Sequence, residues 1–339
     1  MSGLAITPLD PFDLAEYDAF YDVYLAAERA GGDAGSPWMR DEVLVELQGT
    51  AARRWIGGFV GRSEGRVVAV GQLSTPLLDN LDSATLSVHV APEDRRRGHG
   101  TALLARLEAE AATRGRQVIN AEASWAYEAG PDGAGEPGPA FAAARGYALG
   151  LGDVKRRVDL PVDPRLLEDI ADEARSHHAA YVLRSWVGPV PDELLSGWAA
   201  LTASLVTEAP TGDLEREPEV ADPSIVRESE AIIARQGRTK FNTVALGADG
   251  EVVAYSDLAT TIHEPGRAYQ WGTLVRGDAR GHRLGLAVKV ANLRLLQHER
   301  PDIRELITYN AEVNAHMIGV NERLGFVPVA RLGEFQKRT

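Results

Sequence analysis

Apolar and polar residues alternate along short segments in the first half of the chain, a pattern that predicts β-strands. Residues 55–60 and 67–73 lie on either side of a turn at residues 63–65, so we expect them to form a hairpin. The next segment, residues 85–90, has an apolar side chain at every second position. Three consecutive strands are therefore expected before the first strongly predicted helix.

That helix is expected to begin near Gly98, because leucines and alanines recur at helical spacing after it. Gly115 follows where a helix C-terminal cap belongs. Beyond it the pattern predicts a strand at residues 117–122, a short helix at 138–144 and a strand at 147–160. The first half thus has the composition of one α/β domain.

The same series of elements occurs again because the sequence repeats. Residues 65–73 recur as residues 250–258, and residues 95–100 recur as residues 280–285, each after 185 positions. In the second half the repeat predicts strands at 242–246, 252–258, 269–275 and 305–308, and helices at 284–298 and 315–323.

The repeat predicts an α/β (α+β) fold made of two tandem domains, residues 1–160 and 161–339. The boundary is expected at residues 161–164, which contain two prolines. Asp163 or Pro164 can begin a connecting helix that reaches about residue 178.

Composition restricts the partners of the protein. The net charge is −13, with 49 acidic and 36 basic residues, which disfavours nucleic acid because phosphate binding relies on Lys and Arg. No apolar run is long enough for a membrane helix, and the first residues lack the profile of a signal peptide. We expect a cytoplasmic protein with no nucleic-acid or membrane partner, either a monomer or a homodimer.

The absence of cysteine excludes disulfides, thiolate metal sites and an acyl-cysteine intermediate. No group of His, Asp and Glu has the spacing of metal ligands either, so no metal is expected. If acyl transfer occurs, direct attack of the acceptor on a thioester is the simpler route.

A loop rich in Arg and Gly joins the third strand to the helix. The first turn of a helix has unpaired N–H groups and the positive end of the helix dipole, so it holds anions well. Glycine at Gly98 and Gly100 allows close approach, and residues 95–97 are three arginines. A dinucleotide fingerprint is excluded because the loop follows an antiparallel hairpin, and the Gly-Lys-Ser/Thr ending of a P-loop is absent.

Residues 90–104 resemble the acyl-CoA signature of the GNAT acetyltransferases, Gln/Arg-x-x-Gly-x-Gly/Ala, with Arg95, Gly98 and Gly100 at its fixed positions. The resemblance covers about residues 59–147 and again 243–326. It implies two GNAT-like domains, each a mixed, mostly antiparallel sheet flanked by helices. It also implies a splayed gap between the fourth and fifth strands that holds the pantetheine of acetyl-CoA.

The resemblance implies a set of cofactor-binding residues in both halves, although the second loop has Arg283 in place of Gly98. Its members are Val88, Val90, Arg95, Arg96, Arg97, Gly98, His99, Gly100, Thr101, Leu274, Val275, Arg280, Gly281, His282, Arg283, Gly285 and Asn314.

Candidates for proton transfer and acceptor binding lie mainly in the second half. By resemblance, Asn321 stands where many members have an acid tyrosine, and Tyr269 stands where others have a base. His263 is a further candidate base. Asp257 can anchor an ammonium group, and Trp271 and Trp125 can line an acceptor pocket. The alternative for Tyr269, Asp257 and His263 is an ordinary structural or surface position.

These observations predict an acyl-CoA-dependent N-acyltransferase that acts on a small-molecule amine. A protein or peptide N-acetyltransferase and a non-catalytic acyl-CoA sensor are the alternatives. The polar candidates favour the second half as the reactive one, in a layout similar to mycothiol synthase, whereas the loop glycines favour the first half as the cofactor site.

Overall fold

The computed structural model describes residues 4–339 and divides the chain into two compact units. Unit 1 runs to Asp153 and also includes Gly212–Glu215 and Ala330–Thr339; unit 2 consists of Val154–Thr211 and Arg216–Val329. The predicted division at residue 160 differs from this in three respects. The boundary falls earlier, inside strand β6 (Ala148–Asp159), and both residues 212–215 and the last ten residues belong to unit 1.

Unit 1 contains a mostly antiparallel sheet with the strand order β1-β2-β3-β4-β5-β12. Every pair in it is antiparallel except β4 with β5, which is parallel. The strands are β1 (Ala5–Pro8), β2 (Arg54–Ser63), β3 (Arg66–Pro76), β4 (Ser83–Val90), β5 (Val118–Ala126) and β12 (Val327–Arg338). The predicted mixed, mostly antiparallel sheet is confirmed.

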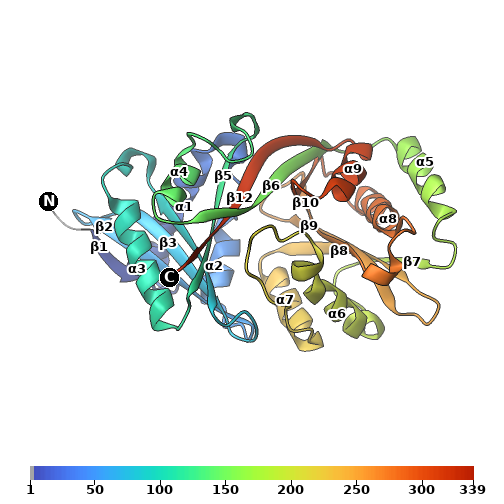
Figure 1. The fold of residues 1–339 in the computed structure, drawn as a ribbon, viewed down its shortest axis with the longest axis horizontal. Helices are drawn as coiled ribbons and strands as arrows, with labels where there is room; N and C mark the ends of the chain where they lie inside the picture. The colour runs from blue at the N-terminus through green and yellow to red at the C-terminus, as the bar shows by residue number, and fades with distance from the viewer. Residues whose placement is uncertain (1–3) are drawn as a thin grey trace. The chain divides into compact units, whose positions relative to one another are not determined.

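Helices cover both faces of this sheet (Figure 1). Helix α3 (His99–Thr113) packs on one face, where Leu103 and Leu107 join a buried cluster with Leu73 and Leu86. Short helix α4 (Pro137–Ala143) contributes Phe141 to the same side. Helices α1 (Leu14–Arg29) and α2 (Arg40–Gln48) form a second cluster with strand residues such as Val60 and Val70.

Unit 2 repeats the arrangement with the strand order β6-β11-β10-β9-β8-β7, in which residues 154–159 of β6 take part. Its parallel pair is β10 with β11. The strands are β7 (Val182–Val187), β8 (Arg238–Leu246), β9 (Val252–Thr261), β10 (Arg267–Val275) and β11 (Glu305–Ala311).

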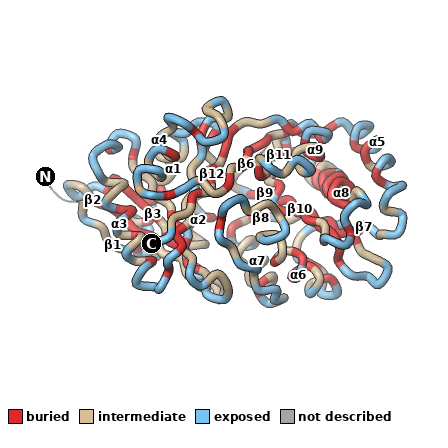
Figure 2. Tube along the Cα trace, in the orientation of Figure 1, coloured by how far each residue is buried: buried red, intermediate tan, exposed pale blue. Residues whose placement is uncertain are grey.

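One face of this second sheet carries α5 (Pro164–Arg175), α8 (Leu284–Glu299) and α9 (Ala315–Arg323), which share a buried cluster with Phe241 and Leu258. The other face carries α6 (Asp192–Glu208), whose Trp198 packs with Val244 and Tyr255, and α7 (Pro223–Arg235). Figure 2 shows α8 as the most continuously buried helix of the unit. No helix in residues 4–339 is long and apolar enough to cross a membrane.

Strand β12 completes unit 1 because it pairs with β5 from Ala330 to Arg338. Phe335 of β12 is only 3% exposed and packs against Trp125.

We predict that Phe335→Ala lowers the free energy of unfolding of unit 1 by about 3 kcal/mol, because a buried aromatic ring is lost. Urea unfolding would measure this. Val327→Ala, at an exposed site on the same strand, is the control, and an equal loss in both variants would contradict the prediction.

Candidate functional site

Strands β4 and β5 pair over only half of β4. The register runs from Ser83 opposite Val118 to Leu86 opposite Ala121 and ends there, although β5 continues to Ala126. On its other edge β4 stays paired with β3 as far as Val90. The second half of β4 therefore has a strand partner on one edge and none on the edge that faces β5, as the predicted splay requires.

The backbone groups of Val88 and Val90 face this unpaired edge. The N–H of Ala91 donates to the carbonyl of Val68 on β3, so alternation in an antiparallel ladder turns residues 91 and 89 toward β3 and residues 90 and 88 away from it. The Val90 carbonyl accepts instead from Arg95 Nε at 3.3 Å. Val88 and Val90 thus have polar backbone groups that an extended amide chain could reach, and their role in cofactor binding stays a prediction.

The loop that follows β4 places the start of α3 beside these groups. Gly98 caps the helix with φ +88°, a left-handed conformation that favours glycine. A Cβ on Gly100 would lie 3.4 Å from Val90 Cγ2, so the backbone of the first turn lies close to the end of β4. The first-turn N–H groups of α3, from residues His99 to Thr101, have no partner within the helix.

Two of the three arginines of this first loop, Arg95 and Arg96, have no acidic partner within residues 4–339. Arg95 donates only to backbone carbonyls, those of Val90 and Ala27. Arg96 is exposed, and its guanidinium has no hydrogen-bond or ion-pair partner within residues 4–339. Arg97 contacts buried Asp94 at 3.1 Å. The loop therefore combines positive charge with unpaired N–H donors, which suits a diphosphate.

The second loop has the same backbone with different side chains. Each loop has two left-handed residues, Arg96 and Gly98 in the first and Gly281 and Arg283 in the second. Arg283 adopts φ +53°, which costs about 1–2 kcal/mol for a residue with a Cβ. The glycine that the first loop uses as helix cap is thus replaced by a strained arginine.

Carboxylates of unit 2 already bind the second loop. Arg283 forms an ion pair with Glu173 of α5, and Arg280 contacts Glu208 of α6 at 2.6 Å. His282 faces the carbonyl of His177 at 3.2 Å. Two of the side chains predicted to hold a diphosphate in unit 2 therefore have internal acidic partners.

The backbone of β10 corrects one predicted contact. Pairing with β11 ends at Tyr269, so β10 also has an unpaired second half. The N–H of Arg276 donates to Val253 on β9, which turns Leu274 toward β9 and Val275 toward the unpaired edge. Val275 is correctly placed for a cofactor, whereas Leu274 is buried and its backbone faces the wrong edge.

Tyr269 is a poor proton acceptor in this environment. Its hydroxyl donates to Glu264 Oε2 at 2.6 Å, and burial together with that carboxylate raises the pKa of the phenol well above its ordinary value. His263 lies in the neighbouring turn after β9, where its backbone N–H donates to Thr261 Oγ1 at 3.3 Å. His263 and Tyr269 therefore lie in the same region of unit 2, and no hydrogen bond within residues 4–339 connects their side chains.

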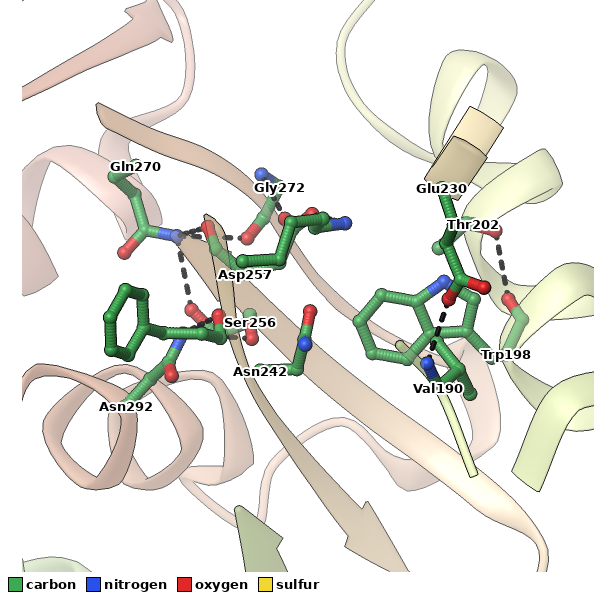
Figure 3. Close-up of polar contacts among 12 residues, drawn as sticks. Val190, Trp198, Thr202, Glu230, Asn242, Ser256, Asp257, Gln270, Gly272 and Asn292 are labelled. Carbon is green, nitrogen blue, oxygen red and sulfur yellow. Dashed lines mark hydrogen bonds and ion pairs between the residues drawn. The ribbon is translucent and has the colours of Figure 1, made fainter. Parts of the chain in front are cut away.

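The carboxylate of Asp257 already has a cationic partner, because Lys240 Nζ lies 2.5 Å from its Oδ2. It is therefore not free to bind a substrate ammonium. Its Oδ1 accepts the N–H of Gly272 at 2.6 Å, where β10 bulges. Gln270 donates to the carbonyls of Asp257 and Gly272 in the same cluster, which Figure 3 shows. The predicted acceptor anchor is thus part of an internal network that fixes the bulge.

The two tryptophans predicted to line an acceptor pocket differ. Trp125 is 1% exposed, donates to the carbonyl of Gly130 at 2.8 Å and packs in the core of unit 1, so its predicted role in binding is wrong. Trp271 is 37% exposed and has the ammonium of Lys240 5.5 Å from its ring centroid. Only Trp271 presents a surface that an acceptor can reach.

Asn314 and Asn321 both have structural partners. Asn314 caps α9, and its Oδ1 accepts the N–H of Met317 at 3.2 Å. Asn321 is fully buried, donates to Asn310 and accepts from Lys289 Nζ at 2.7 Å. Burial lowers the pKa of Lys289 to about 7. Asn321 therefore solvates a buried amine and cannot itself supply a proton.

One pair that the sequence analysis did not identify consists of His89 on β4 and Glu28 on α1. His89 Nε2 is 3.0 Å from Glu28 Oε1, and the His89 side chain is 16% exposed. The sequence analysis places its candidate bases, Tyr269 and His263, in the second half of the chain. The available signal was a lone histidine between Val88 and Val90, the one residue of this strand with an ionisable side chain.

Within residues 4–339 no group of three or more His, Cys, Asp or Glu side chains could hold a metal ion. The site consists of an unpaired strand edge, a positive helix start and the polar residues around them. Unit 1 has this arrangement. Unit 2 has the same arrangement, but its loop arginines Arg280 and Arg283 already have carboxylate partners.

Residues 17–126 match the acetyltransferase (GNAT) family. The chain carries a GNAT domain followed by a second GNAT-like half. The predicted tandem GNAT fold is confirmed, and with it the enzyme class of N-acyltransferases that depend on acyl-CoA. The GNAT family in general uses acetyl-CoA, which fits the loop and strand edge of unit 1.

Solved structures with the same fold include a tandem GNAT protein from the clavulanic acid biosynthesis pathway, with TM-score 0.77 and 28% identity over 99% of this chain and 98% of that one. A GCN5-related N-acetyltransferase from Sphaerobacter thermophilus has TM-score 0.64 and 16% identity over 99% and 95% of the two chains. A search of curated protein sequences finds no match.

Lys289 allows a test of the polar interior of this tandem GNAT protein. Because its pKa is about 7 when folded and near 10.5 when unfolded, the unfolded chain binds more protons between these values, so Lys289 makes stability rise with pH there. We predict that Lys289→Met stabilises the protein by about 1–3 kcal/mol at pH 7 and by much less at pH 10.

Urea unfolding of both proteins at the two pH values measures this difference. Lys337→Met is the matched control, because that ammonium is ion-paired with Glu108 at 2.8 Å. A difference between Lys289→Met and wild type that stays constant from pH 7 to pH 10 would contradict a buried amine with a lowered pKa.

Proposed function

We propose that this protein transfers an acetyl group from acetyl-CoA to a small-molecule amine, and that unit 1 holds the acetyl-CoA. The observation that carries the proposal is the combination, in unit 1, of an unpaired β4 edge at Val88 and Val90 with a helix start that is rich in glycine and free arginine. Unit 2 has the same backbone, but Glu173 and Glu208 bind its loop arginines.

The residues of unit 1 fit each part of the ligand. Arg95, Arg96 and Arg97 and the first turn of α3 suit the diphosphate, because they offer charge-assisted donors and unpaired N–H groups. The backbone groups of Val88 and Val90 suit the amides of the pantetheine arm and the acyl oxygen. Backbone donors that are already in place stabilise charge that develops on that oxygen.

When bound, acetyl-CoA supplies an activated acyl group, so the protein has to orient the acceptor and remove its proton. A small-molecule acceptor is supported by the solved tandem GNAT protein at 28% identity, which comes from a pathway that makes a small molecule, clavulanic acid. The net charge of −13 supports a cationic acceptor by long-range attraction.

The two glycines in the first turns of α3 and α8 provide a matched pair of variants. A Cβ on Gly100 lies 3.4 Å from Val90, and one on Gly285 lies 3.5 Å from Val275, so the first added carbon meets similar contacts at the two sites. We predict that Gly100→Glu weakens acetyl-CoA binding about 100-fold and abolishes turnover, because it places a carboxylate at the diphosphate site. Gly285→Glu is expected to leave turnover within about threefold.

Isothermal titration with acetyl-CoA and a thiol-release assay over a panel of small amines and peptides measure both effects. Loss of turnover in Gly285→Glu alone would transfer the reaction to unit 2 and overturn the assignment. Binding without thiol release on any acceptor would identify a sensor, and release only with peptides would identify a peptide N-acetyltransferase. Gly100→Gln, which adds a side chain of the same size without the charge, is the control for the added bulk.

A further inference from the structure

We infer that His89 is the proton acceptor for the incoming amine, that Glu28 positions it, and that unit 1 is consequently the reactive unit. This inference rests on the proposed function. It departs from the expectation that the second half, with its polar candidates, carries the reaction.

His89 lies in the unpaired half of β4, between the two residues whose backbone groups face the open edge. Val88 and Val90 direct their side chains into the cluster around α3. Alternation along the strand therefore turns His89 toward the opposite face, where its register partner Val70 packs with α1 and α2. The imidazole is thus one residue from the backbone donors proposed for the acyl oxygen.

The ring has a fixed orientation. Glu28 Oε1 lies 3.0 Å from His89 Nε2, and Oε2 of the same carboxylate accepts the N–H of Ser36 at 3.2 Å. The ring of Tyr24, one helical turn before Glu28, meets the imidazole edge-on at 4.9 Å. A carboxylate that accepts from Nε2–H leaves the Nδ1 lone pair of His89 to take a proton.

The side chain is also accessible enough to meet an acceptor. Sixteen per cent of the His89 side chain is exposed. By contrast, Tyr17 and Phe20, which lie on α1 as Glu28 does, are buried in the core. The His89–Glu28 pair therefore combines a fixed ring with a path to solvent. These are the two requirements for a general base whose substrate arrives from outside.

Unit 2 has no such pair. The 185-residue offset of the repeat places Leu274 where unit 1 has His89, and Leu274 is 7% exposed within an apolar cluster. The last residue of α6, Glu208, binds Arg280 of the loop instead. Unit 2 therefore lacks a proton acceptor at this position, whereas unit 1 has one beside its cofactor loop.

The step balances in atoms and charge. An ammonium acceptor first loses one proton to solvent, and the neutral amine nitrogen then forms a bond to the acyl carbon while the carbon–sulfur bond of the thioester breaks. The second proton that the nitrogen loses goes to His89 Nδ1, and the leaving CoA thiolate takes a proton from water. His89 returns its proton to solvent after the amide product leaves, and Glu28 remains the hydrogen-bond partner of the ring.

The test compares His89→Ala and His89→Gln with wild type in the thiol-release assay. Removal of a general base is expected to lower kcat by about 100-fold or more while the acetyl-CoA dissociation constant stays within threefold. Free imidazole is expected to restore part of the turnover of His89→Ala, an effect that a purely structural role would not give. Glu28→Gln is expected to lower kcat by about tenfold, and Glu28→Asp to recover part of that loss.

His298→Gln is the matched control, because His298 also neighbours a glutamate, Glu299 at 4.0 Å, but is 85% exposed in unit 2. Turnover within threefold of wild type in His89→Gln would overturn the inference alone. Equal losses of acetyl-CoA binding and turnover without imidazole rescue would also overturn it. Absence of turnover in wild type with every acceptor would remove the proposed function, and this inference with it.

Discussion

The early end of pairing between β4 and β5 is the constraint on which the site depends. Beyond Leu86 the backbone groups of β4 that face β5 have no strand partner, although the surrounding sheet is buried. Backbone N–H and C=O groups away from water need partners, so such an edge favours a ligand that is itself an extended chain of amides. The positive start of α3 lies directly after the same strand and adds an anion site at one end.

The loops of the two units have the same backbone conformation, and a few side chains change how much positive charge each loop offers to an anion. Both loops contain two left-handed positions, and each has glycine at one of them and arginine at the other, in opposite order. In unit 1 the glycine caps the helix, Arg95 contacts backbone carbonyls, Arg96 is exposed and only Arg97 of the three arginines contacts a carboxylate, that of Asp94. In unit 2 the arginine caps the helix and pairs with Glu173, which neutralises charge where an anion would bind.

Internal neutralisation also distinguishes the polar residues of unit 2. Asp257 has Lys240 and the N–H of Gly272 as partners, and Lys289 has Asn321. Buried polar groups that are satisfied in this way rigidify a fold but have little capacity left for a ligand. The His89–Glu28 pair differs in its place, because His89 lies in the unpaired half of β4 next to the loop of unit 1.

The sequence by itself determined the architecture: the apolar alternation gave the strands, the 185-residue repeat gave two similar halves, and the Arg/Gly loop located the anion site at Gly98. These features follow from local periodicity and backbone conformation, which a linear pattern records. Only the tertiary structure decided that Leu274 faces the wrong edge, that Trp125 belongs to the core, and that residues 330–339 complete unit 1. Strand register, burial and the pairing of charges such as Glu28 with His89 depend on contacts between segments far apart in the chain, and no local pattern encodes them.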